Sequence, residues 1–317
     1  MREVIGFLLR RRETAAFLAL VLLFIVLSAV RPKSFPTAEN LGIVARQFSM
    51  IATMGVGMTM AIVLAGIDLS VGSVLALAGC LTALSMTKGI SIPLAILFGL
   101  LCGAFCGFIN GIAIVGVRMP PFIATLGMMS IARGLTYVIT GGWPITGLPE
   151  KFFFLGQGMI GPIPMPVVIM LFCLIVGHII MSNTVLGRAI YAIGGNEQAA
   201  FLSGINVNRV KIIVYTLAGL LSGLAGVVMT SRLSSAQPNS GLGIELDVIA
   251  AVIIGGASFA GGEGTIVGTF IGAAFMGILR NGLVLLNVSA YWQQVVIGAV
   301  IMGAVAIDFL RTRRIQR

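Results

Sequence analysis

Long apolar runs separated by short polar stretches make up almost the whole chain. Most runs approach the roughly 20 residues with which a helix crosses a hydrocarbon core about 30 Å thick. Ten such segments are predicted, of which the third and the eighth are short: about 14–30, 48–66, 71–86, 92–116, 121–141, 163–181, 210–230, 247–260, 264–281 and 290–309. The pattern predicts an all-α polytopic membrane protein with about ten transmembrane helices.

Composition agrees with this prediction, because the chain is 58% hydrophobic and 9% charged, whereas about a quarter of an ordinary soluble domain is charged. No polar block longer than about 30 residues interrupts the apolar segments, so a separate soluble domain has no place. Residues 1–317 are therefore expected to form a single transmembrane domain.

The net charge of +10 would suggest a nucleic-acid partner in a soluble protein, but here the basic residues gather at segment ends. With the N-terminus inside, twelve of the twenty lie on the cytoplasmic side and seven outside, while Arg133 falls within a span. This asymmetry indicates that both termini are cytoplasmic and that no nucleic acid is bound. The first apolar run is better interpreted as an uncleaved span than as a signal peptide.

Motifs for catalysis or metal binding are missing from the sequence. The four cysteines lie inside apolar runs without a CxxC pair, and there is one histidine, so neither a metal site nor a cofactor is expected. The sequence contains no HExxH, GxSxG or GxxxxGK[ST]. An intramembrane enzyme is therefore disfavoured, and ATP hydrolysis would have to come from a partner.

Two matched interruptions divide apolar runs in the two halves of the chain. Residues 61–72, "AIVLAGIDLSVG", align with residues 251–262, "AVIIGGASFAGG", at a constant offset of 190. Paired interrupted helices are typical of a translocation pathway, because non-helical backbone at membrane depth must be buried in protein or line a watery cavity. The alternative is an ordinary turn at the cytoplasmic face with solvated carboxylates. The candidate pathway residues are Asp68, Ser70, Asn110, Thr125, Ser258 and Glu263.

Other polar and small residues have simpler explanations. Arg133 is expected to pack or to snorkel rather than to contact a substrate. Glycines recur every four residues in "GLLCGAFCGFING", from Gly99 to Gly111, and again from Gly264 to Gly272. Such stripes predict close helix packing.

The loop at 182–211 is the most polar stretch of the chain. Within it, "NEQAAFLSG" places helix-forming residues between glycines and predicts a short surface helix. This helix is the obvious docking element for a cytoplasmic partner.

Several long blocks resemble the transmembrane permease of ribose-type ABC sugar importers, across about residues 35–309. They include "GMTMAIVLAGIDLSVGSVLAL", "PPFIATLGMMSIARG" and "RLSSAQPNSGLGIELDVIAAVIIGGASFAGGEGTIVGTFIGA". The resemblance implies a multi-pass protein of the bacterial cytoplasmic membrane that imports a ribose-like sugar. It also implies a cytoplasmic ATP-binding subunit, an extracytoplasmic sugar-binding protein and a second permease copy, expected to form a homodimer.

ABC importer permeases broadly carry a cytoplasmic coupling motif, EAAxxxG, which this chain matches with a departure. Gln198 stands where the motif has glutamate, and Glu197 lies one place early. By resemblance, 195–204 would be the coupling helix. The coupling residues implied are Asn196, Glu197, Gln198, Ala199, Ala200 and Gly204.

A second class of function is an ion-coupled secondary transporter that uses Asp68 or Glu263. The offset of 190 weakens it, because Ser258 stands opposite Asp68, so the carboxylates do not form a symmetric pair. Asp68 is then expected to fix its helix break by capping or hydrogen bonding, beside a sugar pathway.

Overall fold

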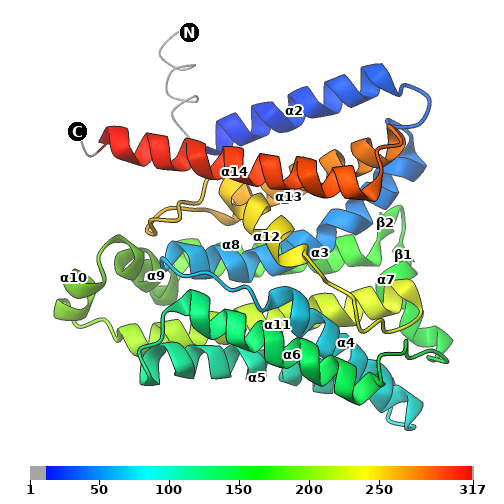
Figure 1. Ribbon diagram of the computed structural model, residues 1–317, viewed down its shortest axis with the longest axis horizontal. Coiled ribbons are helices and arrows are strands. Elements are labelled where there is room, and N and C mark those ends of the chain that lie inside the picture. Colours follow the sequence, from blue (N-terminus) through cyan, green and yellow to red (C-terminus); the bar gives the residue numbers. More distant parts are fainter. Residues whose placement is uncertain (1–11, 316–317) are drawn as a thin grey trace.

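Every predicted apolar segment forms a helix in the computed structural model, which describes residues 12–315 (Figure 1). These helices are α2 (Arg12–Val30), α3 (Ala38–Val63), α4 (Val71–Thr87), α5 (Ile92–Gly116), α6 (Pro121–Thr140), α8 (Met165–Asn183), α11 (Val207–Leu233), α12 (Ile244–Ile254), α13 (Ile266–Leu285) and α14 (Ala290–Ile315). Within the described part, seven helices are long and apolar enough to cross a membrane. The all-α polytopic fold is confirmed, and α4 and α12 are short as predicted, with 17 and 11 residues.

Two of the helix boundaries that differ from the sequence prediction have a clear local cause. The second segment begins at Ala38 instead of residue 48, because Thr37 caps it by accepting a hydrogen bond from the backbone of Asn40. The eighth segment ends at Ile254 instead of residue 260, since Gly256 takes a φ of 100° that an α-helix does not allow. Neither the cap at Thr37 nor the backbone conformation of Gly256 can be predicted from hydropathy alone.

The connecting segments carry the remaining elements. Between α6 and α8 lie η1 (Glu150–Phe153), α7 (Phe154–Gln157) and a small antiparallel hairpin of β1 (Met159–Ile160) and β2 (Ile163–Pro164). Between α8 and α11 lie α9 (Val185–Gly195) and α10 (Glu197–Leu202). The short helix predicted in the loop at 182–211 is therefore present as α10.

The bundle has two distinct ends (Figure 1). The α10 end carries α9 and α10, and the opposite hairpin end carries α7, β1 and β2; α2 begins and α14 ends at the α10 end. Arg118 and Lys211 line a groove beside α10, whereas Arg46 contacts Met159 of β1. The two groups of basic residues thus lie at opposite ends, while Arg2, Arg10, Arg11 and Arg317 lie outside the described residues.

Close packing at glycines holds the long helices together. α5 and α11 pack face to face, so that a β-carbon added at Gly103 or Gly107 would overlap the backbone of Gly219 or Tyr215. α12 and α13 meet in the same way at Gly272, where a β-carbon would overlap the carbonyl of Ala251. The predicted glycine stripes are therefore packing surfaces, at which the small residue lets two backbones approach closely, except that Gly264 precedes α13 and does not belong to its stripe.

Candidate functional site

Asp68 organises the first helix break, residues 64–70, between α3 and α4. Its side chain is 1% exposed, and Oδ1 accepts hydrogen bonds from the backbone N and the hydroxyl of Ser70, at 2.9 and 2.5 Å. Ser70 is the N-cap of α4 but makes no side-chain cap of its own. The carboxylate therefore links the break to the first turn of α4, and it is not a solvated cap.

Two neighbouring helices complete a buried polar group around this break. Asn110 of α5 donates from Nδ2 to the Ser70 hydroxyl at 3.0 Å, and Thr125 of α6 donates to the Ile67 carbonyl at 3.1 Å. Four predicted pathway residues, namely Asp68, Ser70, Asn110 and Thr125, thus meet at one place; each is at most 1% exposed. We call these four residues the first-break cluster.

Tyr215 of α11 lies beside the first-break cluster, and sequence reasoning missed it. Its hydroxyl packs against Gly66, where no β-carbon would fit. Together with Asp68 Oδ2 and Asn110 Oδ1, this hydroxyl has no hydrogen-bond partner among the described residues. Buried polar atoms in proteins are normally paired. These three atoms can therefore form further hydrogen bonds, beyond those of the first-break cluster.

The second helix break, residues 255–265, lies between α12 and α13 and is built differently. Ser258 is 2% exposed, and its backbone N donates to the Glu263 carbonyl at 3.1 Å. The Glu263 side chain is exposed. These two predicted pathway residues belong to the second break and take no part in the hydrogen bonds of the first-break cluster.

The two breaks touch each other at the α10 end. The backbone N of Gly262 donates to the carbonyl of Val63, the last residue of α3, at 2.9 Å. Gly194 of α9 lies against the same carbonyl so closely that a β-carbon would overlap it. Three segments far apart in the sequence therefore meet through their backbones.

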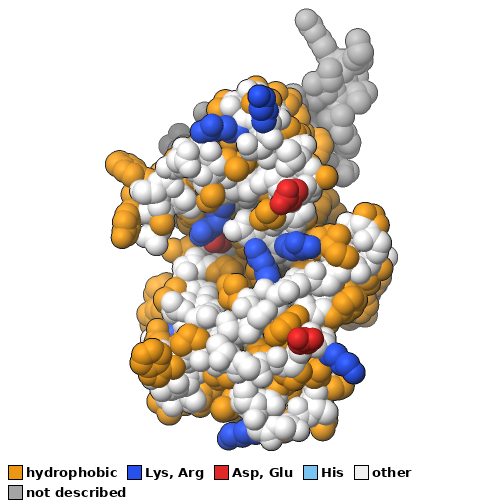
Figure 2. All heavy atoms as spheres, turned by 90° about the vertical axis from the view of Figure 1, so that its right-hand side faces the viewer, with side chains coloured by type: hydrophobic (Ala, Val, Ile, Leu, Met, Phe, Trp, Pro, Cys, Tyr) orange, Lys and Arg blue, Asp and Glu red, His pale blue; other side chains and the backbone are white. Residues whose placement is uncertain are grey.

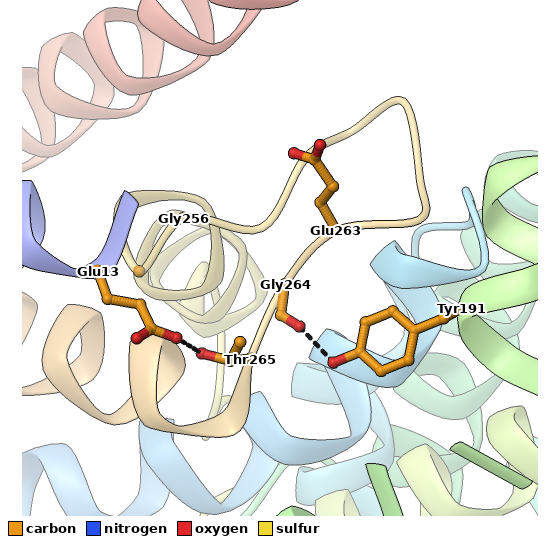
Figure 3. A pocket seen from close by; sticks show the side chains of 7 residues that line it. Glu13, Tyr191, Gly256, Glu263, Gly264 and Thr265 are labelled. Atoms are coloured by element: carbon orange, nitrogen blue, oxygen red, sulfur yellow. Dashed lines mark hydrogen bonds between the residues drawn. The ribbon is translucent and has the colours of Figure 1, made fainter. Parts of the chain in front are cut away.

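A cavity of about 420 Å³ opens beside the second break. Figure 3 shows Tyr191 extending from α9 to donate to the Gly264 carbonyl, a bond of 2.6 Å, and Glu13 of α2 accepting a hydrogen bond from Thr265. Glu263 also lines this cavity. Neither Tyr191 nor Glu13 has a sequence motif that marks it; the only signal is a polar group at the edge of an apolar run.

The predicted coupling residues lie on α10 and its flanks. Asn196 caps α10 by accepting from the backbone of Ala199 at 2.9 Å, and Glu197 forms an ion pair with Lys211 at 2.7 Å. Ala200 is buried, whereas Gln198 is exposed. Gly204 follows the helix with a φ of 85°, which suits glycine.

The C-terminal part of α10 exposes apolar side chains. Phe201 is 69% exposed and Leu202 is 84% exposed. A groove of about 780 Å³ runs beside them and is lined by Gln198, Arg118 and Asn208, among others. An exposed apolar patch next to a polar groove is typical of a protein interaction site.

The hairpin end presents a basic face. Figure 2 shows Lys and Arg side chains gathered over the middle of this face. Arg46 donates to the Met159 sulfur of β1 at 3.1 Å, while Arg280 pairs with the buried Asp247 at 2.6 Å. Arg133 faces inward and holds the 235–243 loop by donating to the Pro238 and Ser240 carbonyls at 2.7 and 2.9 Å, so its role here is structural.

The cysteines take no part in these sites. Cys80, Cys106 and Cys173 are buried, Cys102 is half-buried and none is in a disulfide. In the described part of the chain, no three His, Cys, Asp or Glu residues come together as a metal site would require.

Comparison with known proteins gives relatives along almost the whole chain. Residues 40–305 match the family described as "Branched-chain amino acid transport system / permease component". The chain is 48% identical to the ribose import permease protein of Bacillus subtilis over 299 residues, which cover 94% of this chain and 92% of that protein. It is 47% identical to the ribose import permease protein of Escherichia coli K12, with 93% of each chain covered.

A relative named for another sugar is somewhat more distant. The D-allose transport system permease protein of Escherichia coli K12 is 41% identical over 93% of this chain and 90% of its own length. No solved structure gives a significant match.

Proposed function

The chain belongs to the family of branched-chain amino acid transport system permease components, and on that premise we propose that it is the permease subunit of an ABC importer for a monosaccharide. The observation that carries the proposal is similarity over more than nine-tenths of the chain to permeases named for ribose import. The protein itself would translocate the sugar, and a partner would hydrolyse ATP.

The substrate is proposed to be a ribose-like pentose or a related sugar. Relatives named for ribose and for D-allose support this class. A neutral sugar needs hydrogen-bonding groups along a mostly apolar route rather than a strongly charged site. Asp68, Ser70, Asn110 and Thr125 would supply such groups when the pathway opens, with Ser258 and Glu263 at the second break.

Transport would proceed by alternating access. Ten membrane crossings, with both termini in the cytoplasm, would place the α10 end inside the cell. ATP binding and hydrolysis in the partner would push on α10, and the two helix breaks would then open the pathway to one side at a time. The exposed Phe201 and Leu202 offer the partner an apolar contact.

The hairpin end would face the extracytoplasmic sugar-binding protein. The positive-inside rule normally depletes short external segments of Lys and Arg, yet Arg46 lies against β1 at this end, and Figure 2 shows Lys and Arg side chains on this face. An acidic surface on the binding protein would pair with these cations. A second permease copy would complete the complex as a homodimer in membrane lipid.

Reconstitution tests the proposal directly. The protein is purified with its candidate ATP-binding subunit, placed in liposomes and supplied with the binding protein, either loaded with ribose or empty. Loaded binding protein should raise ATP hydrolysis and drive ribose uptake, whereas an ion gradient without ATP should drive none. Uptake driven by the ion gradient alone would instead establish the secondary transporter that uses Asp68 or Glu263.

A further inference from the structure

α9 contacts both helix breaks, and it is joined to α10 by a single residue. Asn196 ends α9, with its backbone N donating to the Ala192 carbonyl at 3.0 Å, and begins α10, with its side chain accepting from Ala199 at 2.9 Å. Because one residue caps both helices, a displacement of α10 is passed to α9 without a flexible linker between them.

The contact of α9 with the breaks is made by backbone atoms at Gly194. A β-carbon at this residue would overlap the Val63 carbonyl and lie 2.6 Å from the Gly262 nitrogen. From the other side, a β-carbon on Gly261 would lie 2.7 Å from the Gly194 carbonyl. Backbone contacts of this kind have no flexible side chain between them, so a movement of α9 must displace the ends of both breaks.

Tyr191 adds a directional bond to the second break alone. Its hydroxyl donates to Gly264 at 2.6 Å, immediately before Thr265, which caps α13 by accepting from the backbone of Gly268 at 3.0 Å. Burial, and then the charge of Glu13, raise the pKa of Tyr191, so the hydroxyl stays protonated as a donor. The start of α13 is thereby held by α9 (Figure 3).

We propose that Tyr191 and Gly194 are the positioning residues through which movement of α10 reaches the two helix breaks. Gly194 displaces both breaks by contact, and Tyr191 holds the start of α13 to α9. The inference rests on the proposed function and deepens it, because it names the chain's own link between ATP hydrolysis and the pathway. Loss of the link should separate hydrolysis from transport rather than lower both.

The experiment uses the complete complex in liposomes, with ATP hydrolysis and ribose uptake measured in the same preparation. Tyr191→Phe removes the hydroxyl and keeps the ring. It should leave hydrolysis stimulated by loaded binding protein within about twofold of the unsubstituted complex, and lower the ribose imported per ATP about fivefold, the factor expected for one lost hydrogen bond. Tyr291→Phe is the matched control on an exposed tyrosine, 84% exposed, and should not change the ratio.

A neighbouring pair of glycines tests the contact itself. Gly194→Ala must displace Val63 or Gly262, whereas Gly195→Ala adds a methyl group with nothing within 4 Å; both make the same chemical change in the same helix. Gly195→Ala should import as much ribose per ATP as the unsubstituted complex. Gly194→Ala should lower the yield of assembled complex, or lower the ribose imported per ATP by the complex that does assemble.

The outcomes separate the two proposals. If Tyr191→Phe lowers hydrolysis and uptake in equal proportion, or changes neither, this inference is overturned. Gly194→Ala that assembles and keeps the full ratio also overturns it. If the unsubstituted complex shows no stimulation by loaded binding protein, the proposed function itself fails, whatever the variants do.

Discussion

The two helix breaks occupy equivalent places in the two halves of the chain, yet they are stabilised by different means. The first, residues 64–70, is held by Asp68, which bonds twice to Ser70, and by Asn110 of α5 and Thr125 of α6, which donate to the Ser70 hydroxyl and the Ile67 carbonyl. The second, residues 255–265, is held by a bond within its own backbone, by the Val63 carbonyl, and by side chains that reach it from α9 and α2. The first break is therefore joined to α5 and α6, whereas the second break is joined to α9, α2 and the end of α3, so the two breaks follow different helices.

The two helix breaks also differ in length. The offset of 190 continues to the aligned Val71 and Gly261, but α4 begins at Val71 whereas α13 begins only at Ile266. The second break is therefore the longer one, and its additional residues form the loop that lies against α9. In both halves, the aligned residues mark the point at which a helix ends. Asp68 and Ser258 are aligned, but they bond to different groups: Asp68 to Ser70, and the Ser258 backbone to the Glu263 carbonyl.

The largest effect is expected for Asp68→Leu. Leucine leaves the Ser70 backbone N without an acceptor in a buried place, and the two lost hydrogen bonds should lower the free energy of unfolding by roughly 3 kcal/mol. Yield and thermal unfolding of the purified protein measure this loss, and transport should be lost with it. Full transport with leucine at 68 would show that the first break is not held by its aspartate.

An intermediate effect is expected for Thr265→Ala at the second break. The alanine removes the cap of α13 and the bond to Glu13, and loss of a cap costs about 1 kcal/mol. Thermal unfolding of the purified complex should register this decrease, while Thr265→Ser, which keeps the hydroxyl, should restore the original midpoint. Equal midpoints for alanine and serine would mean that the cap does not stabilise the second break.

The smallest effect is expected for Asp68→Asn. The amide oxygen still accepts from Ser70, and the change removes a charge from a buried place, where an unpaired charge is costly. The free energy of unfolding should change by less than about 1 kcal/mol, and uptake of ribose should stay within about threefold of the unsubstituted complex. Uptake abolished by this one change, with assembly intact, would indicate an essential carboxylate and favour ion coupling.

Much of the fold was predictable from sequence because its causes are local. Apolar length predicted the long helices of the bundle but not α7 or α9, and glycine spacing predicted that α5 packs closely against a neighbouring helix, which the structure identifies as α11. The helix in the loop at 182–211 follows from its helix-forming residues and from Asn196 as its cap. The candidate site was predictable only as a set of polar residues. That Asn110 and Thr125 meet the break at Asp68, and that Ser258 does not, depends on which helices are neighbours.

The sequence by itself determined that this is an all-α polytopic membrane protein with two helix breaks, and it predicted a short helix in the loop at 182–211, because hydropathy and glycine content act over a few residues. Only the tertiary structure decided that Val63, Gly194 and Gly262 meet. A backbone contact between glycines leaves no side-chain pattern in the sequence, and a hydrogen bond such as that from Tyr191 to Gly264 exists only when the helices pack at the right distance and angle.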